Sequence, residues 1–127
     1  MEILYEKDLR AMKFHILTST RHHRVVTDLA ARLGLPIQEM RRHLILRLDM
    51  QHLENLPARY DAWMDSGEGD TLERALAADL LTRSIPFLPA AATGEILDEA
   101  RRMVEGGGDP EAALSLGRAR LREVIRS

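Results

Sequence analysis

The chain has 127 residues, of which 45% are apolar and only 4% aromatic, so it fits one small domain with an aliphatic core. It contains no cysteine, which excludes disulfide bonds, thiolate metal sites, iron–sulfur clusters and a cysteine nucleophile. The net charge of −2 hides an asymmetry: residues 7–47 carry nine Lys or Arg against three acids, whereas residues 57–111 carry five Arg against twelve acids.

The composition predicts an all-α fold of six or seven helices, because Leu, Ala, Met, Arg and Glu favour helices over strands. Apolar residues recur at helical spacing along most of the chain. Residues 1–5 are expected to form a short strand or a frayed end. The expected helices, in chain order, cover about residues 6–19, 24–33, 36–54, 57–64, 70–83, 93–105 and 110–126.

The first three of these helices carry the clearest local signals. Leu9, Met12 and Ile16 form an apolar face on the first helix. Gly34 ends the second helix, because glycine adopts the left-handed conformation without strain, and Pro36 suits the first turn of the third. The third helix is apolar around much of its circumference, so it is expected to be buried on several sides or to pair with another chain.

The remaining chain suggests a second unit. We interpret residues 1–56 as one helical unit and residues 57–127 as a helical bundle, although the two could form one compact domain. Between the expected helices of the second unit, two prolines exclude a regular helix through residues 85–92. Phe87 and Leu88 in this loop are expected to fill the core, with a docking role as the alternative.

No segment has the features of a signal peptide or a membrane span. Charged residues interrupt the first 17 positions, so the continuous apolar segment of a secretory signal is missing. No run approaches the roughly 18 apolar residues of a membrane span. We therefore expect a cytoplasmic protein without a membrane partner.

Residues 26–44, VTDLAARLGLPIQEMRRHL, have the pattern of two short helices joined by a tight turn. Ala30 is the small residue that allows close helix approach, and Gly34 makes the turn. Apolar residues lie before and after the turn. The stretch resembles the helix-turn-helix motif of bacterial DNA-binding proteins, with one departure: the last apolar position falls on His43.

The resemblance implies a small DNA-binding transcriptional regulator that acts as a homodimer. Gln38, Arg41 and Arg42 on the second motif helix would face the major groove, where arginine pairs with guanine and glutamine with adenine. Residues before the first motif helix would bind phosphates, which set register and affinity rather than sequence preference. These residues are Arg21, His22, His23 and Arg24.

A second interpretation remains open. The glycine turn could be purely structural, since helix–Gly–helix patterns arise easily in a chain rich in alanine and leucine. The protein would then be a non-enzymatic interaction module, an adaptor or accessory regulator of a larger enzyme or complex, with a partner bound by the C-terminal helices. The charge asymmetry fits either an anionic partner for the basic half or attraction between the two halves.

Catalytic and metal-binding patterns are weak. His43 lies four residues after Glu39 and His52 three residues after Asp49, but the two pairs would face nearly opposite sides of one straight helix. The sequence contains neither a phosphate-binding glycine loop nor a nucleophile elbow. We therefore expect no metal, no cofactor and no enzymatic activity.

Overall fold

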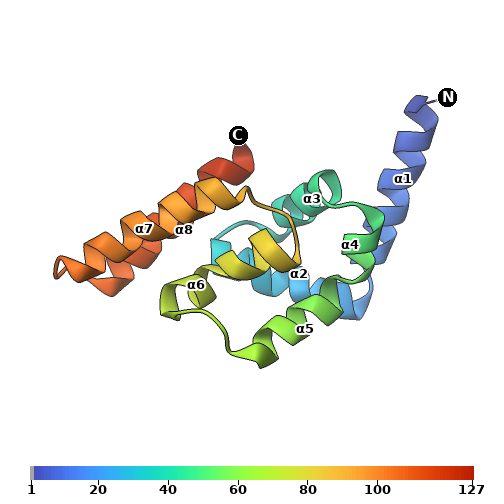
Figure 1. The fold of residues 1–127 in the computed structure, drawn as a ribbon. Coiled ribbons are helices and arrows are strands. Elements are labelled where there is room, and N and C mark those ends of the chain that lie inside the picture. Colours follow the sequence, from blue (N-terminus) through green and yellow to red (C-terminus); the bar gives the residue numbers. More distant parts are fainter. Residues whose placement is uncertain (1) are drawn as a thin grey trace.

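The computed structural model describes the backbone of residues 2–127 and the side chains of residues 7–127 (Figure 1). All regular structure in this part of the chain is helical, which confirms the all-α prediction. In chain order the helices are α1 (Glu2–Leu17), α2 (Thr20–Leu33), α3 (Ile37–Arg47), α4 (Met50–Glu54), α5 (Leu56–Ser66), α6 (Thr71–Leu76), the π-helix η1 (Leu80–Ser84), α7 (Ala90–Glu105) and α8 (Pro110–Arg126).

The arrangement places α2 at the centre of the molecule. It contacts α1, α3, α5, α6 and α8, while α7 and α8 pair as a hairpin along one side (Figure 1). The N-terminal part of α1 projects away from the rest of the fold (Figure 1). One continuous core of buried residues extends from Leu17 to Ile125. Within residues 2–127, no helix has both the length and the apolar character needed to cross a bilayer.

The predicted count of six or seven helices is too low for residues 2–127, which form nine helical elements. The helix expected over residues 36–54 is two helices, because the chain is extended at Leu48 (φ −102°, ψ 140°) and α4 then starts afresh. The Asp49 carboxylate caps that start by accepting a hydrogen bond of 2.8 Å from the His52 backbone amide. A capping side chain of this kind competes with continuation of a helix.

Other predicted boundaries also need correction. Residues 2–5 belong to α1 rather than to a strand. The second helix begins at Thr20, so the break before it is only two residues long. The helix expected over residues 70–83 ends at Ala77, whose φ of 54° is left-handed, and η1 follows. Helix α7 begins at Ala90, three residues before the predicted start at Thr93.

The loop before α7 fills the core, as predicted. Phe87 and Leu88 are both buried among the residues of the core. Their backbone amides donate hydrogen bonds of 2.9 and 3.0 Å to the carbonyl of Leu81, near the start of η1. Phe87 and Leu88 therefore support the packing of α7 and are not available for docking.

The turn at Gly34 has two physical requirements. Its φ of 69° is left-handed, and the amide of Leu35 donates to the Ala30 carbonyl at 2.9 Å, which closes the end of α2. A Cβ atom at Gly34 would also lie only 2.6 Å from the Arg122 guanidinium. That guanidinium donates a hydrogen bond of 2.9 Å to the Leu33 carbonyl, so this bond connects α8 to the turn.

Cationic side chains from distant helices cap several helix C-termini in the same way. Such groups satisfy backbone carbonyls that have no partner inside the helix and oppose the negative end of the helix dipole. At the end of α3, the Lys13 ammonium donates to the carbonyls of Ile45 (3.1 Å) and Leu48 (2.7 Å). The further caps are Arg122 on α2, Arg74 on α5, Arg32 on α6 and Arg47 on α8.

Replacement of Lys13 tests the importance of these caps. We expect Lys13→Met to lower the free energy of unfolding by about 1–3 kcal/mol. Methionine keeps an apolar stem of similar length but has no ammonium, so the buried carbonyls lose their donor. Urea denaturation of both proteins measures this difference. Lys7→Met, at an exposed position on the same helix, is the matched control. Equal stabilities of the two variants would contradict the capping role.

Candidate functional site

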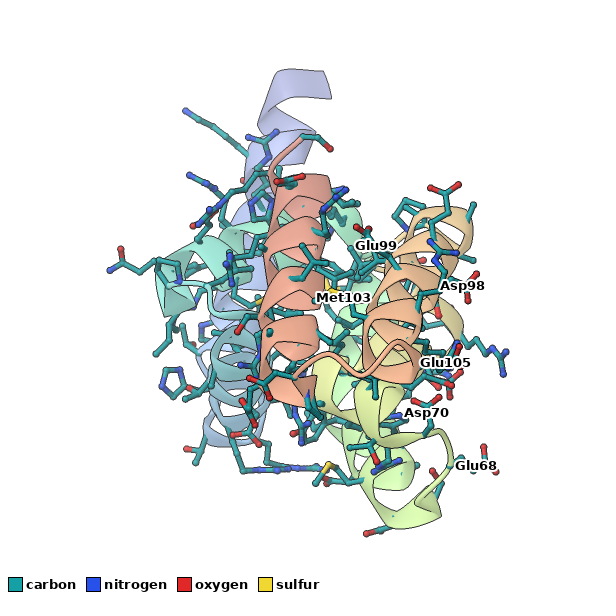
Figure 2. The ribbon with its side chains drawn as sticks, turned by 90° about the vertical axis from the view of Figure 1, so that its left-hand side faces the viewer. Glu68, Asp70, Asp98, Glu99, Met103 and Glu105 are labelled. Atoms are coloured by element: carbon teal, nitrogen blue, oxygen red, sulfur yellow. The ribbon has the colours of Figure 1, made fainter. Side chains whose placement is uncertain are left out.

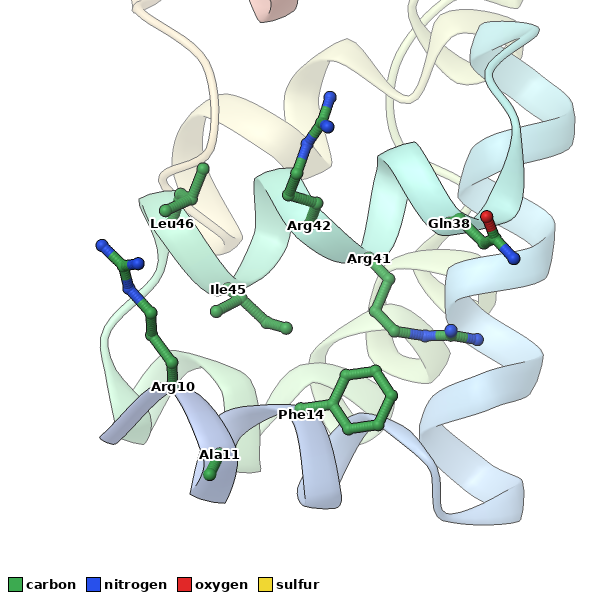
Figure 3. Close-up of a pocket in the computed structure, with 8 residues that line it drawn as sticks. All are labelled: Arg10, Ala11, Phe14, Gln38, Arg41, Arg42, Ile45 and Leu46. Carbon is green, nitrogen blue, oxygen red and sulfur yellow. The ribbon is translucent and has the colours of Figure 1, made fainter. Parts of the chain in front are cut away.

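A groove between α1 and α3 is the strongest candidate site in the described part of the chain. It has a volume of about 670 Å³ and a mainly apolar floor. Figure 3 shows the two helices side by side, with Ile45 directed into the space between them. The groove is lined by Arg10, Ala11 and Phe14 from α1 and by Gln38, Arg41, Arg42, Ile45 and Leu46 from α3.

The helical repeat explains why α3 has two apolar faces. Positions 38, 41, 42, 45 and 46 all line the groove, but the Arg42 side chain points away from α1 (Figure 3). Met40 and Leu44 lie on the other side and are fully buried in the core. Leu46 remains 56% exposed. Of the apolar surface predicted around much of α3, only one side is therefore buried by other helices of the protein.

Helix α1 packs against the neighbouring helices with a face that differs in part from the predicted one. Among the described side chains of α1, Lys13 and Leu17 are buried. Of the predicted apolar face, Leu9 and Ile16 are half-buried, whereas Met12 is 58% exposed. The Lys13 ammonium is bonded to the end of α3, and the next residue, Phe14, lines the groove. Phe14 is 48% exposed there.

The rim of the groove is cationic. Among the residues whose side chains are described, Arg10, Arg41 and Arg42 form no ion pair, and no acid lines the groove. The Arg41 guanidinium lies 5.6 Å from the centroid of the Phe14 ring, and Figure 3 shows it extended over that ring while Arg42 points to the opposite side of α3. The Arg41 Nε atom is buried and has no hydrogen-bond partner among the described residues.

Other arginines of the chain pair with acids across the fold. Arg24 binds Asp61 at 2.9 Å, and Arg126 binds both carboxylate oxygens of Glu39 at 2.6 and 3.0 Å. The hydrogen bond from Arg126 holds the pKa of Glu39 below its ordinary value. The basic and acidic segments therefore attract each other in places, and the groove arginines lie outside these pairs.

The residues predicted to bind nucleic acid fall into two groups. Gln38, Arg41 and Arg42 line the groove, although the Arg42 guanidinium points away from α1 (Figure 3). Arg21 and His23 are exposed near the start of α2, outside the groove lining. Two further side chains already have partners inside the chain. Arg24 binds Asp61, and His22 lies 2.8 Å from the Leu53 carbonyl through Nε2 and 2.7 Å from Ser19 Oγ through Nδ1.

Sequence reasoning missed the contribution of α1 to this site. Arg10, Ala11 and Phe14 line the groove, but they were not among the predicted site residues. Phe14 lies off the predicted apolar stripe of its helix, and an aromatic residue outside such a stripe is the one signal that pointed to it. The pairing of α1 with α3 has no counterpart in the local pattern of the sequence.

The two carboxylate–histidine pairs do not combine into a larger cluster. Glu39 is bound by Arg126, and its Oε1 lies 3.8 Å from His43 Nε2. The His52 ring lies 2.7 Å from the Asp49 carboxylate. Among the residues whose side chains are described, no group of three or more potential metal ligands occurs.

The fold and the groove define a small all-helical protein with an open, arginine-rimmed apolar groove. The chain belongs to the EhaM-like family, whose pattern matches residues 13–126. The match includes Phe14 and all of the α3 side of the groove, whereas Arg10 and Ala11 precede it. No curated protein and no solved structure shows a significant match to the chain.

His43 gives the fold a pH dependence. Burial, with the nearby Arg47 and Arg42 guanidinium groups, holds the pKa of His43 below its ordinary value of 6.5. The unfolded chain therefore binds a proton more readily than the folded chain, so stability rises with pH through this range. We expect His43→Gln to reduce the slope of unfolding free energy between about pH 5 and pH 7.

Urea denaturation across this pH range measures the slope. His23→Gln replaces an exposed histidine and is the matched control. Glu39 also stabilises the fold only while it is ionised, but its contribution is lost at lower pH, below its ordinary value of 4.5. An unchanged slope in His43→Gln would show that His43 is not responsible.

Proposed function

We propose that this protein is a non-enzymatic interaction module, an adaptor or accessory regulator of a larger complex, which binds a protein partner in the groove between α1 and α3. The observation that carries this proposal is the exposure of Phe14 and Leu46 beside arginines that have no partner in the described chain. Aromatic and arginine side chains are enriched at protein interfaces and dominate their binding energy.

The chemistry of the lining supports binding rather than catalysis. The polar groups are guanidinium and amide groups. Arginine stays protonated in proteins and an amide does not titrate, so neither can act as a general base at neutral pH. The remaining side chains are apolar and supply contact area.

The C-terminal helices offer less support for partner binding than predicted. Figure 2 shows Asp98, Glu99 and Glu105 along α7, with Asp70 near them. Three of these acids already have partners: Arg101 binds Asp70 at 2.6 Å and lies 3.7 Å from Asp98, and Arg120 binds Glu99 at 3.2 Å. The net charge available to a partner on this face is therefore reduced.

A DNA-binding regulator with a helix-turn-helix unit is the second candidate. It is supported by Gln38 and Arg42, which are both exposed on the helix that follows the Gly34 turn. We rank it below the interaction module because Ile45 and Leu46 lie on the same face, and apolar side chains gain little beside phosphates. Dimerisation would be needed to supply enough contacts.

Affinity purification from the native host tests the interaction module. We expect the tagged protein to retain one stoichiometric protein partner, and Leu46→Gln to reduce its recovery about tenfold or more, because truncation of a central interface residue costs about 2 kcal/mol. Quantitative mass spectrometry measures the recovery. Surface substitutions of this kind change stability little.

Met12→Gln is the matched control, because Met12 is exposed on α1 but does not line the groove. It should leave the recovery of the partner unchanged. A partner that Leu46→Gln retains in full would contradict binding in this groove.

A mobility-shift assay with genomic DNA fragments tests the second candidate. A regulator should retard DNA at low salt, and its affinity should fall by about the 0.9 power of salt concentration for each phosphate contact. The double variant Arg41→Ala with Arg42→Ala should then weaken binding strongly, whereas Arg102→Ala, at an exposed position on α7, should not. No retardation at low salt would contradict DNA binding.

A further inference from the structure

We infer that the groove between α1 and α3 receives an acidic amphipathic helix of another protein. This inference rests on the proposed function and names the chemistry of the partner. It follows from three properties of the groove: its helical walls, its apolar floor and the three arginines on its rim, which form no ion pair with a described residue.

The shape of the groove fits a third helix. Its walls are two helices that lie side by side, and the lining positions on α3 extend from Gln38 to Leu46 (Figure 3). At 1.5 Å per residue this stretch is about 12 Å long, which corresponds to roughly two turns of a partner helix. A helix in a groove of this kind is anchored by apolar residues at positions i, i+3 or i+4, and i+7.

The floor of the groove supplies complementary anchor sites. Ala11 is small and permits close approach of a partner helix, while Phe14, Ile45 and Leu46 offer apolar area. Phe14 and Leu46 are about half exposed, so a partner helix would remove their apolar surface from water. That burial is favourable in proportion to the area covered.

The charges on the rim select an acidic partner. Arg10, Arg41 and Arg42 contribute three positive charges, and no carboxylate of residues 7–127 lines the groove. Figure 3 shows Arg10 at one end of the groove and Arg41 toward the other. Carboxylates on both flanks of an amphipathic helix could therefore pair with guanidinium groups while its apolar face occupies the floor.

Arg41 has a specific reason to bind a carboxylate. Its Nε atom is buried without a hydrogen-bond partner in the described chain, and its guanidinium covers part of the Phe14 ring. A buried donor without an acceptor is energetically costly. A carboxylate that draws the guanidinium off the ring would give Nε an acceptor and would expose Phe14 to the apolar face of the partner.

Two peptides of about 18 residues, long enough to form helices, test this inference. Both carry leucine at i, i+3, i+4 and i+7, flanked by glutamate in one peptide and by lysine in the other. We expect the full chain to bind the labelled glutamate peptide at least tenfold more tightly than the lysine peptide, as measured by fluorescence anisotropy. The preference should decrease as salt is raised.

Variants locate the binding surface. Arg10→Gln and Arg42→Gln should each weaken binding of the glutamate peptide several-fold, and Arg41→Lys should weaken it although the charge is kept, because lysine lacks the planar fork of arginine. Arg102→Gln, which removes an exposed arginine on α7, should have no effect. Equal binding of the two peptides, or equal effects of Arg42→Gln and Arg102→Gln, would overturn the inference.

Three further results would also overturn it. A duplex oligonucleotide that displaces the glutamate peptide from the groove at lower concentration would identify nucleic acid as the ligand. A dimer in sedimentation that Leu46→Gln abolishes would identify a second copy of the chain. If neither peptide binds but the native partner still depends on Leu46, the interaction module stands and the acidic helix is rejected.

Discussion

The bond between the Lys13 ammonium and the C-terminal carbonyls of α3 determines the geometry on which the rest of the site depends. The end of a helix has carbonyls without internal partners and a negative partial charge. Lys13 satisfies two of these carbonyls in a buried position and so holds α1 against α3. Because Phe14 is the next residue and Ile45 supplies one of the carbonyls, this bond also sets the two walls of the groove.

The cations of this protein divide according to what they contact. One group caps helix ends, as Arg122 does on α2, and a second group pairs with acids, as Arg126 does with Glu39. Both groups hold segments together that are far apart in the sequence. The arginines on the groove rim belong to neither group, so the fold itself does not explain them. Their clustering beside exposed apolar side chains is the basis for proposing a partner.

Local signals predicted part of this arrangement correctly. Gly34 and Pro36 located the turn between α2 and α3, because left-handed backbone and the first helical turn have strong residue preferences. The three α3 residues singled out from the sequence, Gln38, Arg41 and Arg42, all line the groove. The prediction of a single long helix through residue 54 was wrong, because apolar spacing was given more weight than the capping signal at Asp49.

The sequence by itself determined the helical class, the turn at Gly34 and the face that carries the α3 arginines, since each depends on residues within a few positions of one another. Only the tertiary structure decided which face of α1 meets α3, which cations cap distant helix ends and which remain without a partner. These outcomes depend on contacts between residues more than thirty positions apart, such as Lys13 with Leu48. No local preference encodes such a contact, because its energy exists only once the helices have packed.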